Sequence, residues 1–313
     1  MLTAFVAALA LAPVEAELKI TASRPLVGVR AIAVAAASTG SKIAVTVEDN
    51  SVRIYDAATR QLVRTMVGHP QQPMAIAWSA DGAMIATGDE SARIFIWDAR
   101  SGARLKVLQG HTRGIQALSF NPARTLLAST GKDDAVKIWD VASGKLKSTI
   151  LGKGANLFSA TYRSKLNDFG LGTLAGAARL YGGDNNIKGF MTAHSAEGVF
   201  DIDFNATGTR AVTCGRDANG AIWDVAKYTR MNYLCGHTDW VVHGKFSPKG
   251  KYVATGSADR TVRIWNVFSY KLEIVLENQS AVGSPVVWTG DGKYLITVNI
   301  DDFLTVNQLS SAQ

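Results

Sequence analysis

Five histidines are the residues of this sequence that most invite a metal-binding or catalytic interpretation. No four-ligand Cys/His spacing of the kind found in zinc sites accompanies them, and no G-x-S-x-G nucleophile motif occurs. Three of the histidines instead begin sets of four residues at nearly the same spacing, and this recurrence favours a structural role over a catalytic one. The sets are His111, Ser129, Asp133 and Trp139; His194, Thr213, Asp217 and Trp223; and His237, Thr255, Asp259 and Trp265.

A glycine-rich stretch, Gly170-Leu171-Gly172 with Gly176, resembles a dinucleotide-binding loop. Such a loop works by placing a phosphate at the start of a helix. Here the glycines fall where the repeats described below place short strands, and no helical pattern follows them. We therefore expect no cofactor.

The composition describes a globular chain of 313 residues that is 47% hydrophobic, enough to bury a large core. Charged residues make up 19% without a long run of one sign, which excludes wholesale disorder. The net charge of +7 favours acidic partners, but the basic residues are scattered singly, so no specific nucleic-acid binding is expected. Two cysteines cannot form a disulfide framework, and no apolar run reaches the roughly 18 residues of a membrane span.

The first sixteen residues differ from the rest, because an apolar stretch is followed by Val14-Glu15-Ala16, which fits the small residues of a cleavage site. This outline predicts a secretory signal peptide over residues 1–16, although no Lys or Arg precedes the apolar run. The protein would then be exported, periplasmic or secreted. The alternative is a cytoplasmic protein that keeps residues 1–16 as a short hydrophobic segment packed on the body.

Internal repetition is the strongest pattern in the remaining chain, residues 17–313. Short apolar segments end in an aromatic residue at positions 55, 97, 139, 181, 223 and 265, which are equally spaced along the sequence. A weaker seventh copy follows at Val306-Asn307, where the valine falls one position short of the same interval. In phase with these positions, several copies open with Gly-His: Gly68-His69, Gly110-His111 and Gly236-His237.

This combination of Gly-His and Trp-Asp markers resembles the WD40 repeat, a β-propeller family. The resemblance covers essentially all of residues 17–313 and implies an all-β fold of seven four-stranded antiparallel blades. The seventh copy ends soon after its third strand, and an N-terminal strand in the segment Glu17 to Ser23 would complete that last blade. Such closure would leave no unpaired sheet edge at the join.

The resemblance also gives the three sets of four residues a role. In similar proteins these four side chains form one hydrogen-bonded chain inside a blade: the Asp accepts from the imidazole, and the Ser or Thr hydroxyl bridges the imidazole and the indole N–H, which donates. Other copies depart from this pattern. His69 has Thr87 and Trp97 but Ser91 at the expected Asp position, and the copy from Lys153 to about Ala193 has neither His nor Asp. That copy is predicted to be the least internally braced.

Proteins of this kind usually act as rigid platforms for peptides or protein domains, and we expect the same non-catalytic role here, as a monomer within complexes. The face that carries the loops after each Gly-His, called the top face below, is the predicted site. Trp240 is a candidate anchor, and Phe158 with Phe200 could clamp an entering side chain. The partner is expected to be acidic or Arg-containing. The other candidate residues are the basic Arg113, Lys132, Arg216 and Arg260.

Each of these candidates also has a structural explanation: Trp240 folded onto its own blade, the two phenylalanines filling the channel wall, and solvated basic side chains. Two other functions stay open. A propeller enzyme would need converging acids or a metal at the channel mouth, and a cytoplasmic scaffold subunit would keep residues 1–16. Aligned copies predict a mostly apolar mouth, which speaks against the enzyme: Ile32, Met74, Gln116, Phe158, Phe200, Val242 and Ser284.

Overall fold

The structure, a computed structural model, describes residues 18–163, 166–192, 194, 198–280 and 285–310. Over these residues the chain forms 27 β-strands and no helix, so the prediction of an all-β fold is confirmed for this part of the chain. The predicted signal peptide, residues 1–16, lies outside the described residues. Within the described part, no element is a helix of the length and hydropathy that crossing a membrane requires.

Five sheets have four antiparallel strands each, hydrogen-bonded in chain order. The first is β5 (Pro73–Trp78), β6 (Met84–Asp89), β7 (Arg93–Asp98) and β8 (Arg104–Gln109). The second is β9 (Ile115–Phe120), β10 (Leu126–Gly131), β11 (Ala135–Asp140) and β12 (Leu146–Leu151). The third is β13 (Leu157–Tyr162), β14 (Phe169–Thr173), β15 (Ala178–Tyr181) and β16 (Ile187–Met191).

The fourth and fifth sheets repeat this order with the same short connections. The fourth is β17 (Val199–Phe204), β18 (Arg210–Gly215), β19 (Gly220–Asp224) and β20 (Thr229–Leu234). The fifth is β21 (Val241–Phe246), β22 (Tyr252–Ser257), β23 (Val262–Asn266) and β24 (Leu272–Leu276).

A sixth sheet has seven strands in the order β25-β26-β27-β1-β2-β3-β4, and the long strand β1 (Ile20–Ala36) joins its two halves. The first part of β1 pairs with β27, from Ile20 opposite Leu309 onward, and its last part pairs with β2. The other strands are β2 (Lys42–Val47), β3 (Val52–Asp56), β4 (Leu62–Met66), β25 (Val287–Trp288), β26 (Tyr294–Val298) and β27 (Phe303–Leu309).

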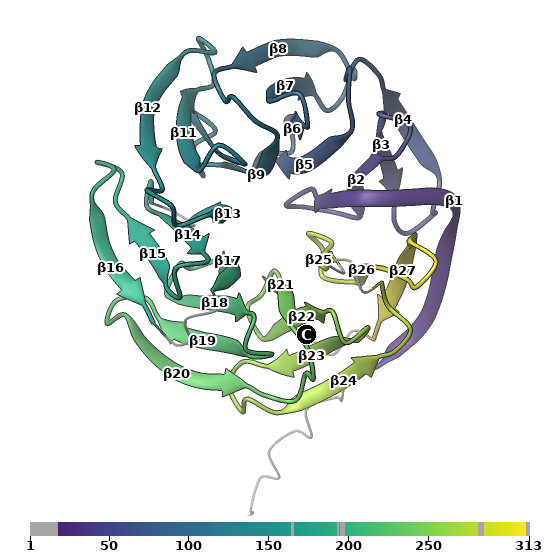
Figure 1. The fold of residues 1–313 in the computed structure, drawn as a ribbon. Helices are drawn as coiled ribbons and strands as arrows, with labels where there is room; N and C mark the ends of the chain where they lie inside the picture. Colours follow the sequence, from purple (N-terminus) through teal and green to yellow (C-terminus); the bar gives the residue numbers. More distant parts are fainter. Residues whose placement is uncertain (1–17, 164–165, 193, 195–197, 281–284, 311–313) are drawn as a thin grey trace, which may run out of the picture.

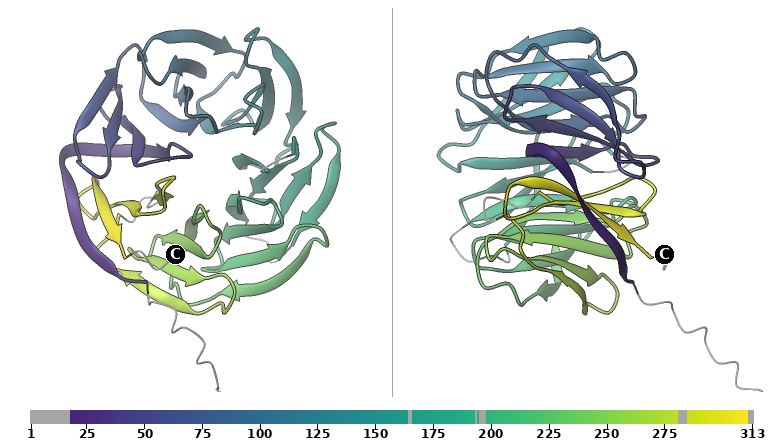
Figure 2. Two further views of the ribbon diagram at one scale, coloured as in Figure 1. Left: turned by 180° about the vertical axis from the view of Figure 1, so that it is seen from behind. Right: turned by 90° about the vertical axis from the view of Figure 1, so that its right-hand side faces the viewer.

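The sheets stand around a central space, with the first strand of each innermost and the last strand outermost (Figure 1). Seen from the side, the ring is a thick disc, and β1 crosses it beside β27 (Figure 2). This arrangement of four-stranded antiparallel sheets is consistent with a β-propeller.

Burial follows the position of each strand in its sheet. Second and third strands are covered on both faces by neighbouring sheets, so β6 and β22 are buried almost throughout. Outer strands such as β8 bury few residues. The core therefore lies between sheets, as where Ile115 and Leu127 of one sheet pack with Ile94 and Leu108 of the previous one.

The recurring aromatic positions all fall near the end of a third strand, which explains their constant spacing. Trp265 on β23 pairs with Val253. The seventh copy keeps this register, because Asn307 on β27 pairs with Leu295, and both residues follow Trp265 and Val253 at the repeat interval. The Asn307 amide Nδ2–H also donates to Thr297 Oγ1 at 3.1 Å. Asn307 therefore occupies the aromatic position, and the predicted placement of the seventh copy at Val306 was one position early.

Candidate protein-interaction site at the central cavity

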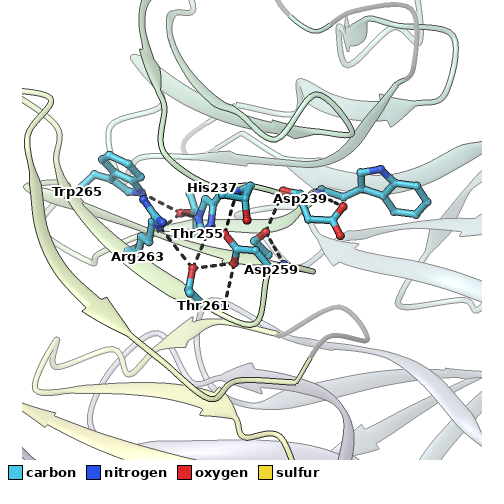
Figure 3. A network of polar contacts seen from close by, with 10 residues as sticks. His237, Asp239, Thr255, Asp259, Thr261, Arg263 and Trp265 are labelled. Carbon is cyan, nitrogen blue, oxygen red and sulfur yellow. Dashed lines mark hydrogen bonds and ion pairs between the residues drawn. The ribbon is translucent and has the colours of Figure 1, made fainter.

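Each set of His, Ser or Thr, Asp and Trp forms one hydrogen-bonded chain, in which the His comes from the loop before the first strand, the hydroxyl from the second strand, the Asp from the turn after it and the Trp from the third strand. In the β21–β24 sheet, His237 Nδ1–H donates to Asp259 Oδ2 at 2.8 Å, and Thr255 Oγ1–H donates to His237 Nε2 at 2.8 Å (Figure 3). The Trp265 indole N–H donates to the same Thr255 Oγ1 at 2.8 Å. Because a carboxylate only accepts, this geometry requires the Nδ1–H tautomer of His237.

The other two predicted sets have the same geometry. His111 contacts Asp133 and Ser129, each at 2.8 Å, and Trp139 donates to Ser129 at 2.8 Å. The set headed by His194 repeats these distances: Asp217 and Thr213 lie 2.8 Å from its two ring nitrogens, and Trp223 donates to Thr213 at 2.8 Å.

Burial favours the neutral form of two of these imidazoles, His237 and His111. Burial lowers the pKa of His237 and of His111, outweighing the carboxylates of Asp259 and Asp133, which act to raise it. For Asp259, burial acts to raise the pKa, but the hydrogen bonds from Thr261 and His237 outweigh it and hold the value at about 2. The Asp259 carboxylate already accepts several hydrogen bonds, and both ring nitrogens of the neutral His237 imidazole are hydrogen-bonded. Neither group therefore has much capacity left for catalysis.

The β5–β8 sheet also has a complete chain, headed by His69 in the loop before β5, contrary to what its sequence suggests. Ser91 occupies the expected Asp position, but the carboxylate comes from Asp89, at the end of β6. Asp89 Oδ2 lies 2.9 Å from His69 Nδ1, and Thr87 Oγ1 lies 2.6 Å from His69 Nε2. Ser91 Oγ–H donates to Asp89 Oδ1 at 2.7 Å. The serine at the expected Asp position therefore orients the Asp89 carboxylate, which is the group that contacts His69.

The glycine-rich stretch lies on β14, a strand of the third sheet, and no helix follows it within the described residues. Gly172 has a packing role, because a β-carbon there would lie 2.9 Å from the carbonyl oxygen of Val199 and 3.0 Å from that of Phe200. Its small size lets the neighbouring strand β17 approach closely, and a phosphate-binding turn is not formed.

A cavity of about 780 Å³ occupies the centre of the ring. Volumes of this size suit a small ligand or the side chains of a bound peptide. All predicted mouth residues that the structure describes line it, and Ser284 lies outside the described residues. The strands β1, β5 and β9 contribute mainly apolar side chains, whereas β13, β17 and β21 contribute polar, charged and aromatic ones. The apolar group includes Ile32, Val34, Met74, Ile76, Ile115 and Leu118.

An aromatic cluster lies at the polar side of the cavity, on three successive inner strands or the loops leading into them. Phe158 and Phe200 meet edge to face with ring centroids 5.4 Å apart. Trp240 lies 5.8 Å from Phe200 and is 41% exposed. The Arg216 guanidinium carbon lies 4.2 Å from the centroid of the Trp240 ring. The structure therefore brings these four candidate residues together.

The remaining basic candidates are more dispersed. Lys132 lines the cavity, but its ammonium pairs with Glu90 at 2.7 Å. Arg113 and Arg260 are exposed and do not line the cavity. Asp133, which follows Lys132, and Asp259, which precedes Arg260, accept hydrogen bonds in the histidine chains.

A charged cluster in the cavity wall escaped the sequence analysis. Asp201 on β17 is 5% exposed, and its Oδ2 accepts from Lys245 Nζ at 2.8 Å and from Gly244 N–H at 3.3 Å. Its Oδ1 accepts from Ile202 N–H at 2.9 Å, and His243 Nδ1 lies 3.5 Å from Oδ2. The signal was present as alternating polar residues in VFDIDF and VVHGKF, which aligned repeats place on adjacent inner strands.

Electrostatics explains how this cluster is stable. Burial acts to raise the pKa of Asp201, but the Lys245 charge and the His243 hydrogen bond outweigh it and give a pKa of about 2. Burial acts to lower the pKa of Lys245, and the charges of Asp201 and Asp203 outweigh that effect and raise it. The pair ties β17 to β21. No group of three or more His, Cys, Asp or Glu residues within the described ranges has the arrangement of a metal site.

The fold and its recurring hydrogen-bonded chains define a repeat protein built from similar four-stranded sheets. A sequence model described as "WD domain, G-beta repeat" matches residues 60–98, 102–140, 184–224 and 228–266, together just over half of the chain. The chain belongs to this WD40 repeat family, so the resemblance drawn from the sequence is confirmed.

Curated relatives are similar over shorter stretches. "Protein HIR1" of Cryptococcus neoformans var. neoformans serotype D is 29% identical over 136 residues, covering 40% of this chain and 15% of that protein. "Guanine nucleotide-binding protein subunit beta" of Saccharomyces cerevisiae is 39% identical over 70 residues, covering 22% of this chain and 16% of that protein. "Guanine nucleotide-binding protein subunit beta-5b" of Danio rerio is 31% identical over 109 residues, covering 34% of this chain and 28% of that protein.

The chain therefore spans less than a third of each of these relatives. WD-repeat relatives of this kind are protein-interaction scaffolds in general, and these comparisons bring no evidence of an enzyme activity. They also give no support to the predicted signal peptide and export, which stay predictions.

Proposed function

We propose that the protein is a non-catalytic interaction platform that binds a peptide or protein segment on its top face, over the mouth of the central cavity. The observation that carries the proposal is the cluster of Phe158, Phe200 and Trp240 beside a cavity of about 780 Å³. Half-exposed aromatic side chains next to an apolar pocket are the usual anchors of protein interfaces.

Rigidity supports this role. The hydrogen-bonded chain of His237 and the Asp201–Lys245 pair fix the strands that carry the aromatic cluster. A surface that is already in its binding geometry loses little conformational entropy when a partner docks. The carboxylate of Asp201 is saturated by three hydrogen-bond donors, which favours a positioning role over acid–base catalysis in the cavity.

The test is affinity capture from native lysate with quantitative mass spectrometry, using the full chain and a Trp240→Ala/Phe158→Ala double variant that circular dichroism shows to be folded. Phe268→Ala is the matched control, because Phe268 is an aromatic residue 64% exposed in the turn between β23 and β24, at the opposite end of the strands. We expect a partner that the wild type and the control retain and the double variant loses. Equal retention by all three proteins would contradict the proposed site.

We further propose that β2–β4 and β25–β27 belong to two separate blades that share β1, which gives seven blades and a closed ring. The pairing of Ala22 with Gln308 supports this proposal. An Ala22→Cys/Gln308→Cys variant should form a disulfide under mild oxidation and raise the thermal midpoint above that of the reduced form. Failure to oxidise, with both thiols accessible to a labelling reagent, would contradict a closed ring.

A further inference from the structure

The guanidinium of Arg216 lies at the aromatic cluster and has hydrogen-bonding capacity that the described structure leaves unused. Arg216 is half-buried in the turn between β18 and β19, and its guanidinium lies over the Trp240 ring. Its Nε is buried without a hydrogen-bond partner, and it forms no ion pair with any residue that the structure describes. A buried N–H donor without an acceptor is costly, which makes this group ready for an incoming acceptor.

Some arginines elsewhere on the molecule are neutralised by a carboxylate of the same chain. Arg53 pairs with Asp49, and Arg124 pairs with Asp81. Arg230, which lies 4.0 Å from the Tyr233 ring in a similar stacked geometry, also donates from Nη1 to the Tyr233 hydroxyl at 2.7 Å. Stacking on an aromatic ring is therefore compatible with a hydrogen bond, and Arg216 differs in having a stacked ring but no acceptor.

The same contacts argue against an arginine or lysine of the partner as the group recognised here. One face of the Trp240 ring is already covered by Arg216 of this chain, and the charge of that guanidinium repels a second cation at the same ring. The buried carboxylate of the cavity wall, Asp201, already accepts from Lys245, Gly244 and Ile202. An incoming cation would meet the positive charge of Arg216 at Trp240 and would have to displace an existing donor at Asp201, whereas an oxyanion would find open donors on Arg216.

Stacking also prepares Arg216 for binding an anion. The ring of Trp240 holds the planar guanidinium in one orientation, so less side-chain entropy is lost when two parallel N–H groups bind a carboxylate or phosphate. An apolar side chain that lines the cavity follows closely in the chain, because Val242 on β21 comes two residues after Trp240. A segment that places an anionic side chain on Arg216 can therefore place a neighbouring apolar side chain in the cavity.

We propose that Arg216, oriented by Trp240, is the specificity-determining residue of the top face, and that it selects peptide segments with a carboxylate or phosphate next to an apolar residue. This inference rests on the proposed function, because it assigns the partner chemistry of the same site. It decides between the acidic and the Arg-containing partners that the sequence left open, in favour of the acidic one.

The experiment uses the full chain and an arrayed library of nine-residue peptides. Each peptide has Glu, phosphoserine, Gln or Ser at the centre and Leu or Phe at one flanking position. We expect wild type to bind Glu or phosphoserine peptides at least about 10-fold more tightly than their Gln or Ser counterparts. The Glu and phosphoserine arms show which oxyanion is preferred. Arg216→Gln should remove the preference, and the matched control Arg230→Gln should keep it.

Three results would overturn the inference: no peptide bound by wild type, no preference for the anionic members, or a preference that survives in Arg216→Gln. The double variant Trp240→Ala/Phe158→Ala shows whether only the role of Arg216 is refuted or whether the proposed top-face site is refuted as well. Neutral peptides that bind wild type and are lost in the double variant would leave the platform intact and refute the role of Arg216. Peptides that bind both proteins equally would refute the top-face site.

Discussion

The β21–β24 and β13–β16 sheets have the same strand order but are held together by different chemistry. The first has a polar chain from His237 through Thr255 to Trp265. The second has Leu171 at the position of Thr255, and Tyr181 at that of Trp265. Phe169 stacks on Tyr181 with ring centroids 5.4 Å apart and planes 7° from parallel, and Tyr162 meets Phe169 edge to face at 5.5 Å.

The β13–β16 sheet is braced by aromatic and apolar packing, and its described residues form no polar chain of this kind. Phe169 and Leu171 are 1% and 0% exposed, so both pack as core side chains, with the apolar Leu171 standing where the other sheet has the Thr255 hydroxyl. Replacing every member of a buried polar network by packed apolar groups can leave stability unchanged, whereas removing one member strands its partners. The prediction that this sheet is the least braced followed from missing polar residues, and the aromatic packing argues against it.

The largest expected effect tests the aromatic stack. Phe169→Ala should lower the free energy of unfolding by about 3–5 kcal/mol, because it opens a cavity between Tyr181 and Tyr162. Urea denaturation followed by circular dichroism measures the loss. Phe190→Ala in the same sheet is the control, since Phe190 is 51% exposed, and it should change stability by less than about 0.5 kcal/mol. Equal effects of the two substitutions would show that the stack does not hold the sheet.

The polar chain is expected to give a smaller loss. Asp259→Ala leaves His237 Nδ1–H without its acceptor and should lower the free energy of unfolding by about 1–3 kcal/mol. Asp259→Asn keeps an amide oxygen as acceptor and should lose less. The same urea titration compares the two variants. An alanine variant as stable as wild type would mean that the network contributes nothing to this sheet.

In the β5–β8 sheet the hydrogen-bonded chain uses Asp89 in place of an aspartate at position 91, so the contributions of Asp89 and Ser91 to stability can be compared. Asp89→Ala should destabilise the protein by about 1 kcal/mol more than Ser91→Ala, since only the aspartate contacts the imidazole of His69. Paired urea titrations of the two variants check the difference. If Ser91→Ala is the more harmful substitution, the carboxylate at Asp89 is not the partner that matters.

The smallest expected effect is a pH dependence of stability to which the histidines of the polar chains contribute near neutral pH. The folded pKa values of His237 and His111 lie below 6.5, so their contribution is fully present above pH 6.5. As the pH falls below 6.5 the unfolded chain takes up protons first, and the free energy of unfolding declines. Asp259, with a pKa of about 2 against 3.8, adds a further loss as the pH falls from about 3.8 towards 2.

Urea midpoints between pH 7.5 and 5 measure the first part of this decline. His111→Gln/His237→Gln should show a shallower decline than wild type, although it is less stable throughout. A decline of the same slope in both proteins would assign the pH dependence to other groups. The β13–β16 sheet, which lacks such a chain, should contribute none of it.

The sequence predicted most of the fold because a single spacing between aromatic residues repeats along the chain, and a repeated strand pattern fixes which residues share a strand position. Contacts that break the repeat could not be predicted in this way. Asp89 reaches His69 from two positions before the expected site, and only the backbone geometry at the end of β6 shows that the carboxylate can do so. The aromatic brace of the β13–β16 sheet needed the positions of Phe169 and Tyr181 in space.

The candidate site was predictable as a set of positions but not as a set of interactions. Aligned copies predicted that Phe158, Phe200 and Val242 face one central space, and the structure places them on the cavity. The stacking of Arg216 on Trp240 joins a turn of one sheet to a loop of the next, and the contact between Asp201 and Lys245 joins the inner strands of the same two sheets. Such contacts depend on how neighbouring sheets pack, which no spacing within one repeat encodes.

The shared strand β1 has a consequence for how the chain folds during synthesis. Its second half can pair with β2 as soon as both emerge, but Lys19 N–H meets its acceptor, Ser310 Oγ, 291 residues later. At about 5–20 residues per second, the first half of β1 waits on the order of 15–60 seconds for β27 to be made. During that time it presents an open strand edge, the kind of surface that chaperones shield and that otherwise pairs with other chains. The slow step in folding of this protein is therefore expected to be the arrival of its last strand.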